Sequence, residues 1–99
     1  MDPRALPGDD LIRAGLDDLA KGIESPQALL VAIGAPRLRR MGVLVPDHPF
    51  ASPEHRLYQY LAQADPDAAH TRYNALIRRL VSFERATECA RSMMRATEA

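Results

Sequence analysis

The first apolar pattern of the chain has the spacing of an α-helix. Four large apolar side chains recur at intervals of four, three and four residues: Ile12, Leu16, Leu19 and Ile23. Residues at these intervals share one helix face. Asp9 or Asp10 is placed to cap the start of this helix, and Gly22 to end it. Residues 1–8 contain two prolines and a glycine, so we expect a loose lead-in there.

A second apolar run follows a capping residue. Ser25 precedes Pro26, which is suited to the first helical position because the missing N–H needs no partner there. Three apolar residues then form the expected buried face: Leu29, Leu30 and Ile33. Pro36 is expected to end this helix and to open a short one that stops at Gly42.

The same combination of a cap and a proline occurs twice more, at Ser52-Pro53 and at Asp65-Pro66. The helix after Pro53 should bury Leu57, Leu61 and Ala64. Between the second and third helices, the apolar triplet 43–45 is followed by prolines, and we interpret it as a buried connector.

The last segment, 66–96, has a heptad pattern. Its seam alternates in steps of four and three: Ala69, Tyr73, Leu76, Leu80, Phe83, Thr87, Ala90 and Met94. Such a seam packs against another helix. A helix of this length is about 46 Å long at 1.5 Å per residue. A domain of this size is only about 35 Å across, so the end of the helix should extend past the other helices.

These elements predict one all-α domain over residues 1–99, a small bundle of four to five helices with a long C-terminal helix. Apolar residues make up 46% of the chain and tryptophan is absent, so leucine, alanine and methionine must fill the core. We expect five leucines to be buried together: Leu16, Leu30, Leu61, Leu76 and Leu80.

The charge of the chain is balanced but unevenly distributed. Its net charge is zero, whereas residues 1–30 are acidic and residues 69–99 carry six arginines against three glutamates. Four arginines beside the seam are expected to form one stripe: Arg72, Arg78, Arg79 and Arg85. A solvated helix face accounts for this stripe best, and contact with a partner protein or a phosphate backbone is the alternative. The acidic N-terminal part offers the stripe an internal partner, which weakens the nucleic-acid interpretation.

No residue pattern indicates catalysis, a cofactor or a metal site. The three histidines are His48, His55 and His70, and their spacing matches no zinc signature. A metal site at Asp47, His48 and His55 and acid–base chemistry at Glu54 and His55 are both disfavoured. The lone Cys89 is expected to be a buried, inert thiol. Without a signal peptide or a long apolar stretch, we expect a soluble, cytoplasmic protein.

Three functional hypotheses follow from this pattern. The preferred one is a non-enzymatic interaction or regulatory module, self-associating or adaptor-like, which forms a homodimer or binds another protein through the C-terminal helix. Its interface would consist of Phe83, Thr87, Ala90 and Met94. The second is a nucleic-acid-binding protein that uses the arginine stripe. The third is an accessory subunit of an enzyme, with His55 or His70 in the site. In size and helical class the chain is similar to small bacterial regulatory and antitoxin-like proteins, but no family motif supports that likeness.

Overall fold

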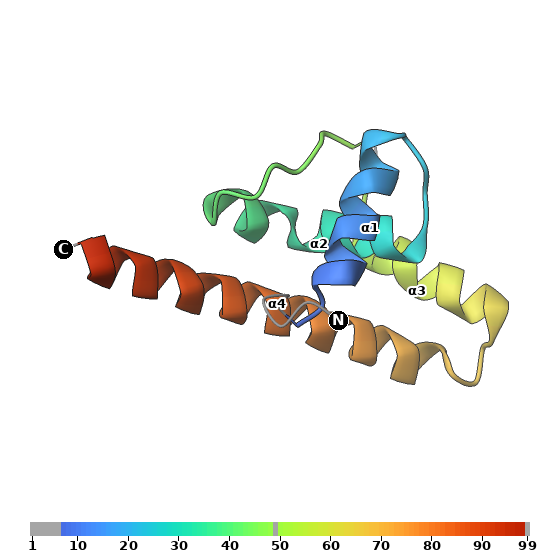
Figure 1. The fold of residues 1–99 in the computed structure, drawn as a ribbon. Coiled ribbons are helices and arrows are strands. Elements are labelled where there is room, and N and C mark those ends of the chain that lie inside the picture. The colour runs from blue at the N-terminus through green and yellow to red at the C-terminus, as the bar shows by residue number, and fades with distance from the viewer. Residues whose placement is uncertain (1–6, 49, 99) are drawn as a thin grey trace.

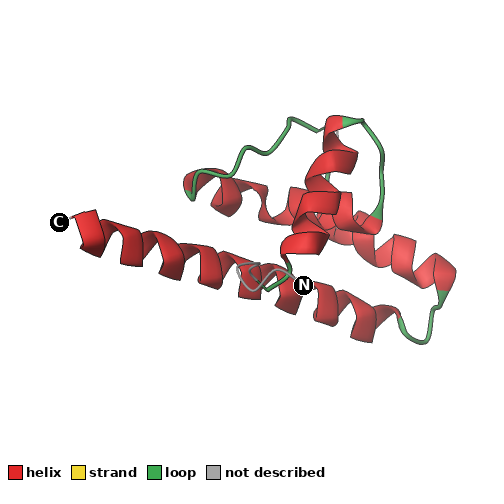
Figure 2. Ribbon diagram, in the orientation of Figure 1, coloured by secondary structure: helices red, strands yellow, loops and turns green. Residues whose placement is uncertain are grey.

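The computed structural model describes residues 7–48 and 50–98, and the side chains as far as Arg91. Four helices make up this part of the chain: α1 (Asp9–Ala20), α2 (Pro26–Arg40), α3 (Pro53–Ala64) and α4 (Ala69–Glu98). The described residues contain no strand, and the predicted all-helical fold with a long C-terminal helix is confirmed (Figures 1 and 2). The molecule measures 49 × 26 × 23 Å. In Figure 1 α4 runs past the other helices, and its C-terminal end extends away from them.

Helix α2 is the centre of the fold. It packs against all three other helices. Its residues Ala28, Leu29, Leu30 and Val31 are all fully buried. Four consecutive residues of an α-helix point in four directions around its axis, so α2 is covered on every side along this stretch. A helix that is apolar all round belongs in a core, and the run from Ala28 to Ala35 has that composition.

Helices α1 and α2 cross at Gly15. A Cβ atom at this position would lie 2.4 Å from the carbonyl oxygen of Gln27 and 2.5 Å from a methyl carbon of Val31. Only glycine leaves room for this approach. Beside the crossing, Asp18 Oδ2 accepts hydrogen bonds from the Ser25 hydroxyl at 2.7 Å and from the Gln27 amide at 2.9 Å.

The three predicted helix starts have different outcomes. Ser25 caps α2 as predicted, because its hydroxyl oxygen accepts a hydrogen bond from the Ala28 N–H at 3.1 Å. Ser52 precedes α3 but has a left-handed backbone, with φ 50°, and its side chain makes no capping bond. The carboxylate of Asp65 accepts from the N–H groups of Asp67 and Ala68. Asp65 therefore shapes the turn that leads to α4, and the helix itself begins at Ala69.

The caps of α1 differ in part from the prediction. Gly8, with φ 77°, is the residue before the helix, so Asp9 and Asp10 occupy its first turn instead of capping it. The prediction for the end of the helix is confirmed, because α1 stops at Ala20 and Gly22 follows with φ 71°.

The prediction that Pro36 ends a helix is wrong. Helix α2 continues through Pro36 to Arg40, so there is no separate helix 36–42 and the described residues form four helices. Proline inside a helix costs about 3 kcal/mol. The continuation is stabilised by Leu38 and Met41, which are both buried beyond the proline. Pro36 itself is exposed.

The core matches the predicted set only partly. Leu30, Leu61 and Leu80 are buried, whereas Leu16 and Leu76 are half-buried at the edge of the core. Among the described residues, five further large side chains are at most 1% exposed: Ile12, Leu29, Val31, Leu38 and Leu57. The connector prediction is wrong at its centre, because Leu44 is 91% exposed.

The cap of α2 gives the first prediction. Ser25→Ala should lower the free energy of unfolding by about 1 kcal/mol, because the Ala28 N–H loses its acceptor. Urea denaturation of the two variants measures the difference. Ser52→Ala is the matched control and should have almost no effect, since the Ser52 side chain makes no capping bond. Equal losses in both variants would contradict this account of the caps.

The crossing at Gly15 gives the second prediction. Alanine favours a helix by about 1 kcal/mol over glycine. Gly15→Ala should nevertheless destabilise the protein by about 1–3 kcal/mol, because the new methyl group meets the backbone of α2. Gly34→Ala should cost less, since its Cβ would meet the flexible end of Leu80, at 2.8 Å. Thermal unfolding of the two variants shows which of them loses more stability. A Gly15→Ala protein that is more stable than the wild type would contradict the close crossing of α1 and α2.

Candidate interaction surface

The apolar seam of α4 is covered over its first half and becomes exposed toward its end. Ala69, Leu80 and Phe83 are buried, Thr87 is half-buried, and Ala90 is exposed. The side chain of Met94 lies outside the described residues. Since positions 83, 87 and 90 share one helix face, the face that is covered at Phe83 is open at Ala90.

The expectation that Phe83 is available to a partner is not compatible with its burial in its own chain, where it is only 7% exposed. A Cβ atom at Gly8 would lie 3.6 Å from Phe83 Cβ and 2.9 Å from the carbonyl oxygen of Arg79. The turn before α1 therefore lies directly over this part of α4. Of the predicted interface, Thr87 is half-buried and Ala90 is exposed.

The four predicted arginines are all exposed, but they do not form one stripe. Residues seven apart in a helix lie in one row, and residues six apart are rotated by about 120°. Arg72 and Arg79 thus form one row and Arg78 and Arg85 another. The guanidinium of Arg79 lies 3.2 Å from the carboxylate of Asp10 in α1, so one row is partly neutralised within the chain.

The candidate reactive residues are scattered. Cys89 is exposed, so the prediction of a buried thiol is wrong. Position 89 is six residues beyond Phe83, which rotates it away from the covered face. His55 and His70 are exposed. His48 stacks on Phe50 with ring centroids 5.7 Å apart, and its buried Nδ1 has no hydrogen-bond partner among the described residues.

Two negative findings apply to the part of the chain that the structure describes. No group of three or more histidine, cysteine, aspartate or glutamate side chains there could hold a metal ion. No described helix has both the length and the apolar character needed to cross a membrane.

An ion cluster joins α4 to the C-terminal half of α2. The Arg37 guanidinium donates two hydrogen bonds to Glu88, at 2.8 and 3.1 Å, and lies 3.7 Å from Glu84. Glu84 is buried, at 4% exposure. Burial raises the pKa of Glu84, and the attraction of Arg37 offsets this only in part. The buried hydroxyl of Thr87, one turn further along α4, has no partner among the described residues.

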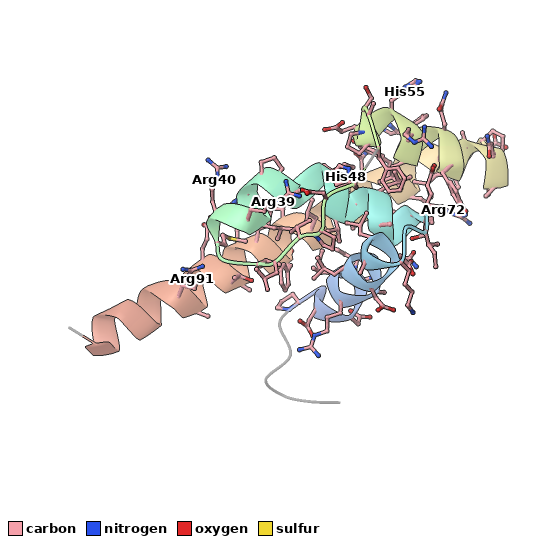
Figure 3. The ribbon with its side chains drawn as sticks, turned by 90° about the horizontal axis from the view of Figure 1, so that it is seen from above. Arg39, Arg40, His48, His55, Arg72 and Arg91 are labelled. Carbon is pink, nitrogen blue, oxygen red and sulfur yellow. The ribbon has the colours of Figure 1, made fainter. Side chains whose placement is uncertain are left out.

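Arginines gather where α2 ends beside α4. Arg39, Arg40 and Arg91 lie toward the C-terminal part of α4, which extends beyond them, and His55 and Arg72 lie on the opposite side of the view (Figure 3). A Cβ atom at Gly42 would lie 2.7 Å from a guanidinium nitrogen of Arg91, so the long side chain of Arg91 crosses the turn that follows α2. The cluster was missed because its members come from two helices. Its one local signal is the basic run after Pro36, directly followed by the apolar triplet 43–45.

The raised pKa of Glu84 gives the third prediction. Its ionised form is less favourable in the folded state than in the unfolded state, so the penalty is full above the folded pKa and absent below the unfolded value near 4.5. Glu84→Gln should therefore raise the melting temperature at pH 8, and the gain should disappear as the pH falls below about 4.5.

Glu88→Gln is the control, since Glu88 is half exposed and bonded to Arg37. It should change stability by less than about 1 kcal/mol, and in the destabilising direction. A Glu84→Gln protein that is less stable than wild type at pH 8 would show that the contact with Arg37 outweighs burial.

Comparisons with known proteins identify no relative of this chain. No protein-family model matches it, and neither a curated protein nor a solved structure shows a significant similarity. Its function must therefore be inferred from its own residues.

Proposed function

We propose that this protein is a non-enzymatic interaction module that associates through the C-terminal part of α4, as a homodimer or with a helical partner. The observation that carries the proposal is the change from buried to exposed side chains along one face of α4. Phe83 is buried within the chain, whereas Ala90 on the same face is exposed. The heptad spacing continues from Ala90 to Met94, so the pattern of a packed helix extends beyond its internal partners.

Helix lengths support this proposal. Helix α4 has 30 residues, and the other three have 12 to 15. At 1.5 Å per residue these are about 45 Å against about 18–22 Å. An isolated helical end of about ten residues gains little stability from its own hydrogen bonds, because most helical stability in proteins comes from packing. Small side chains at Thr87 and Ala90 would let a second helix approach closely.

The nucleic-acid alternative has less support. Arg79 is paired with Asp10, and Arg72 lies in a different row from Arg78 and Arg85. A phosphate-binding surface needs cations that follow one backbone path. The net charge of zero also removes the long-range attraction that steers such proteins to DNA or RNA. The accessory-subunit hypothesis has little support, because His55 and His70 are both exposed and no group among the described residues could hold a metal ion.

The fourth prediction tests this association. Wild-type protein should show a mass above that of one 11.0 kDa chain by light scattering, alone or with a co-purified partner. Ala90→Asp combined with Met94→Asp should give a folded monomer, because two carboxylates would be desolvated in the contact. Phe83 is left unchanged, since a charge there would disturb the core of the chain itself.

The control variant carries the same two charges elsewhere on α4, at Ala75→Asp and Ser82→Asp. Both positions are exposed, and the variant should keep the mass of the wild type. A monomeric wild type at high concentration, with no co-purified partner, would overturn the proposal. Retention on a heparin column that falls steeply with salt would instead favour the nucleic-acid alternative.

A further inference from the structure

The most exposed large apolar side chain of the described residues is Leu44. It is 91% exposed, whereas the next most exposed large apolar residue, Ile23, is 47% exposed. Leu44 lies in the loop after α2, between Val43 and Val45, which are half-buried and pack against the core. The loop is therefore anchored on both sides of a leucine that points into solvent.

This leucine belongs to a shallow groove. The groove is lined by Arg39, Gly42, Val43, Leu44, Val45 and Pro46. Arg39 stiffens the loop, because its guanidinium donates to the carbonyl oxygens of Val45 and Pro46 at 3.2 and 3.3 Å. The surface thus has apolar side chains in the middle and a cation at its edge.

One arginine, Arg39, lines the groove, and two more, Arg40 and Arg91, lie beside the turn where the groove begins. Arg39 has one carboxylate near it, Asp47 at 3.7 Å, and both groups are largely solvated. The described residues supply no ion pair to Arg40, which is exposed, or to Arg91, which crosses Gly42. Basic groups in the last turn of a helix complement its dipole. That role accounts for Arg39 and Arg40 in the last turn of α2. It does not account for Arg91 of α4 or for the exposed Leu44.

We propose that this groove, the Leu44 groove, binds an acidic amphipathic segment of a partner protein. An apolar side chain of the partner would cover Leu44, and its carboxylates would pair with Arg40 and Arg91. The charge complementarity selects an acidic partner, and the concave apolar centre selects a protein segment. A phosphate backbone has no apolar group to cover a leucine. A bilayer is flat at this scale and would not fill a groove. The site is separate from the Ala90 face of α4 and does not rest on the association proposed there.

The fifth prediction uses a defined probe. A fluorescein-labelled peptide of glutamate, leucine and alanine, with leucine on one face and about four helical turns long, should bind the full chain in a fluorescence anisotropy titration. A peptide with lysine in place of glutamate should not bind. A peptide with alanine in place of leucine should bind at least about tenfold more weakly, because it lacks the apolar side chain that covers Leu44.

Two variants locate the binding site on the protein. Leu44→Ser and Arg40→Glu should each weaken binding of the acidic peptide by about tenfold or more. Both residues are exposed, so the fold should be retained. The matched controls are Ile23→Ser, at another exposed apolar residue, and Arg78→Glu, which makes the same charge change on α4. Both controls should bind like the wild type.

Three results would overturn this proposal. The first is an acidic peptide that does not bind, or that binds the Leu44 and Arg40 variants as well as the controls. The second is Leu44-dependent binding to phosphatidylserine vesicles without peptide binding, which would identify a membrane surface. The third is Arg40-dependent binding to a DNA duplex that is indifferent to Leu44→Ser. Because Leu44 lies outside α4, Leu44→Ser should keep the wild-type mass in light scattering while it loses the peptide, and the two proposals can fail separately.

Discussion

The arrangement of the whole molecule depends on the burial of the apolar stretch of α2 that includes Ala28, Leu29, Leu30 and Val31. The other three helices all pack on this one element, and two glycines set how closely they approach. Gly15 of α1 lets the backbone of α2 come near, and Gly34 of α2 gives room to Leu80 of α4. In a chain with only five aromatic residues, close backbone contact replaces large side chains as the means of filling the core.

The shortness of α2 then determines what remains uncovered. Its 15 residues span about half the length of α4. At its C-terminal end it holds α4 through the ion cluster of Arg37, Glu84 and Glu88, and through the approach of Arg91 to Gly42. Beyond these contacts the described chain offers no further helix to pack on α4. The Ala90 face and the Leu44 groove both lie where α2 stops, so the two proposed contact surfaces have one structural origin.

The sequence predicted the features that depend on local chemistry. The cap at Ser25, the stop at Gly22 and the helical spacing of α4 were recognisable because each needs only residues within one or two turns. Pro36 was misread because its local cost is outweighed by the burial of Leu38 and Met41, which depends on other helices. The burial of Phe83 could not be predicted for the same reason, since part of its cover comes from Gly8, far away in the sequence. The cluster of Arg39, Arg40 and Arg91 joins two helices, so the basic run after Pro36 indicates only part of it.

Charge pairing explains why a chain of zero net charge can still present a basic surface. The acidic groups of α1 are mostly satisfied nearby: Asp9 by Arg13, Asp17 by Lys21, and Asp18 by Ser25 and Gln27. Among the ion pairs of the described residues, only Arg79 with Asp10 joins the acidic N-terminal part to the basic C-terminal part. The overall charges of the acidic N-terminal part and the basic C-terminal part suggest that the two neutralise each other across the fold. The ion pairs of the described residues show this at Arg79 and Asp10 alone. Arg40 and Arg91, to which the described residues supply no ion pair, lie at the end of α2 near the exposed Leu44, and an acidic partner with an apolar side chain would match both.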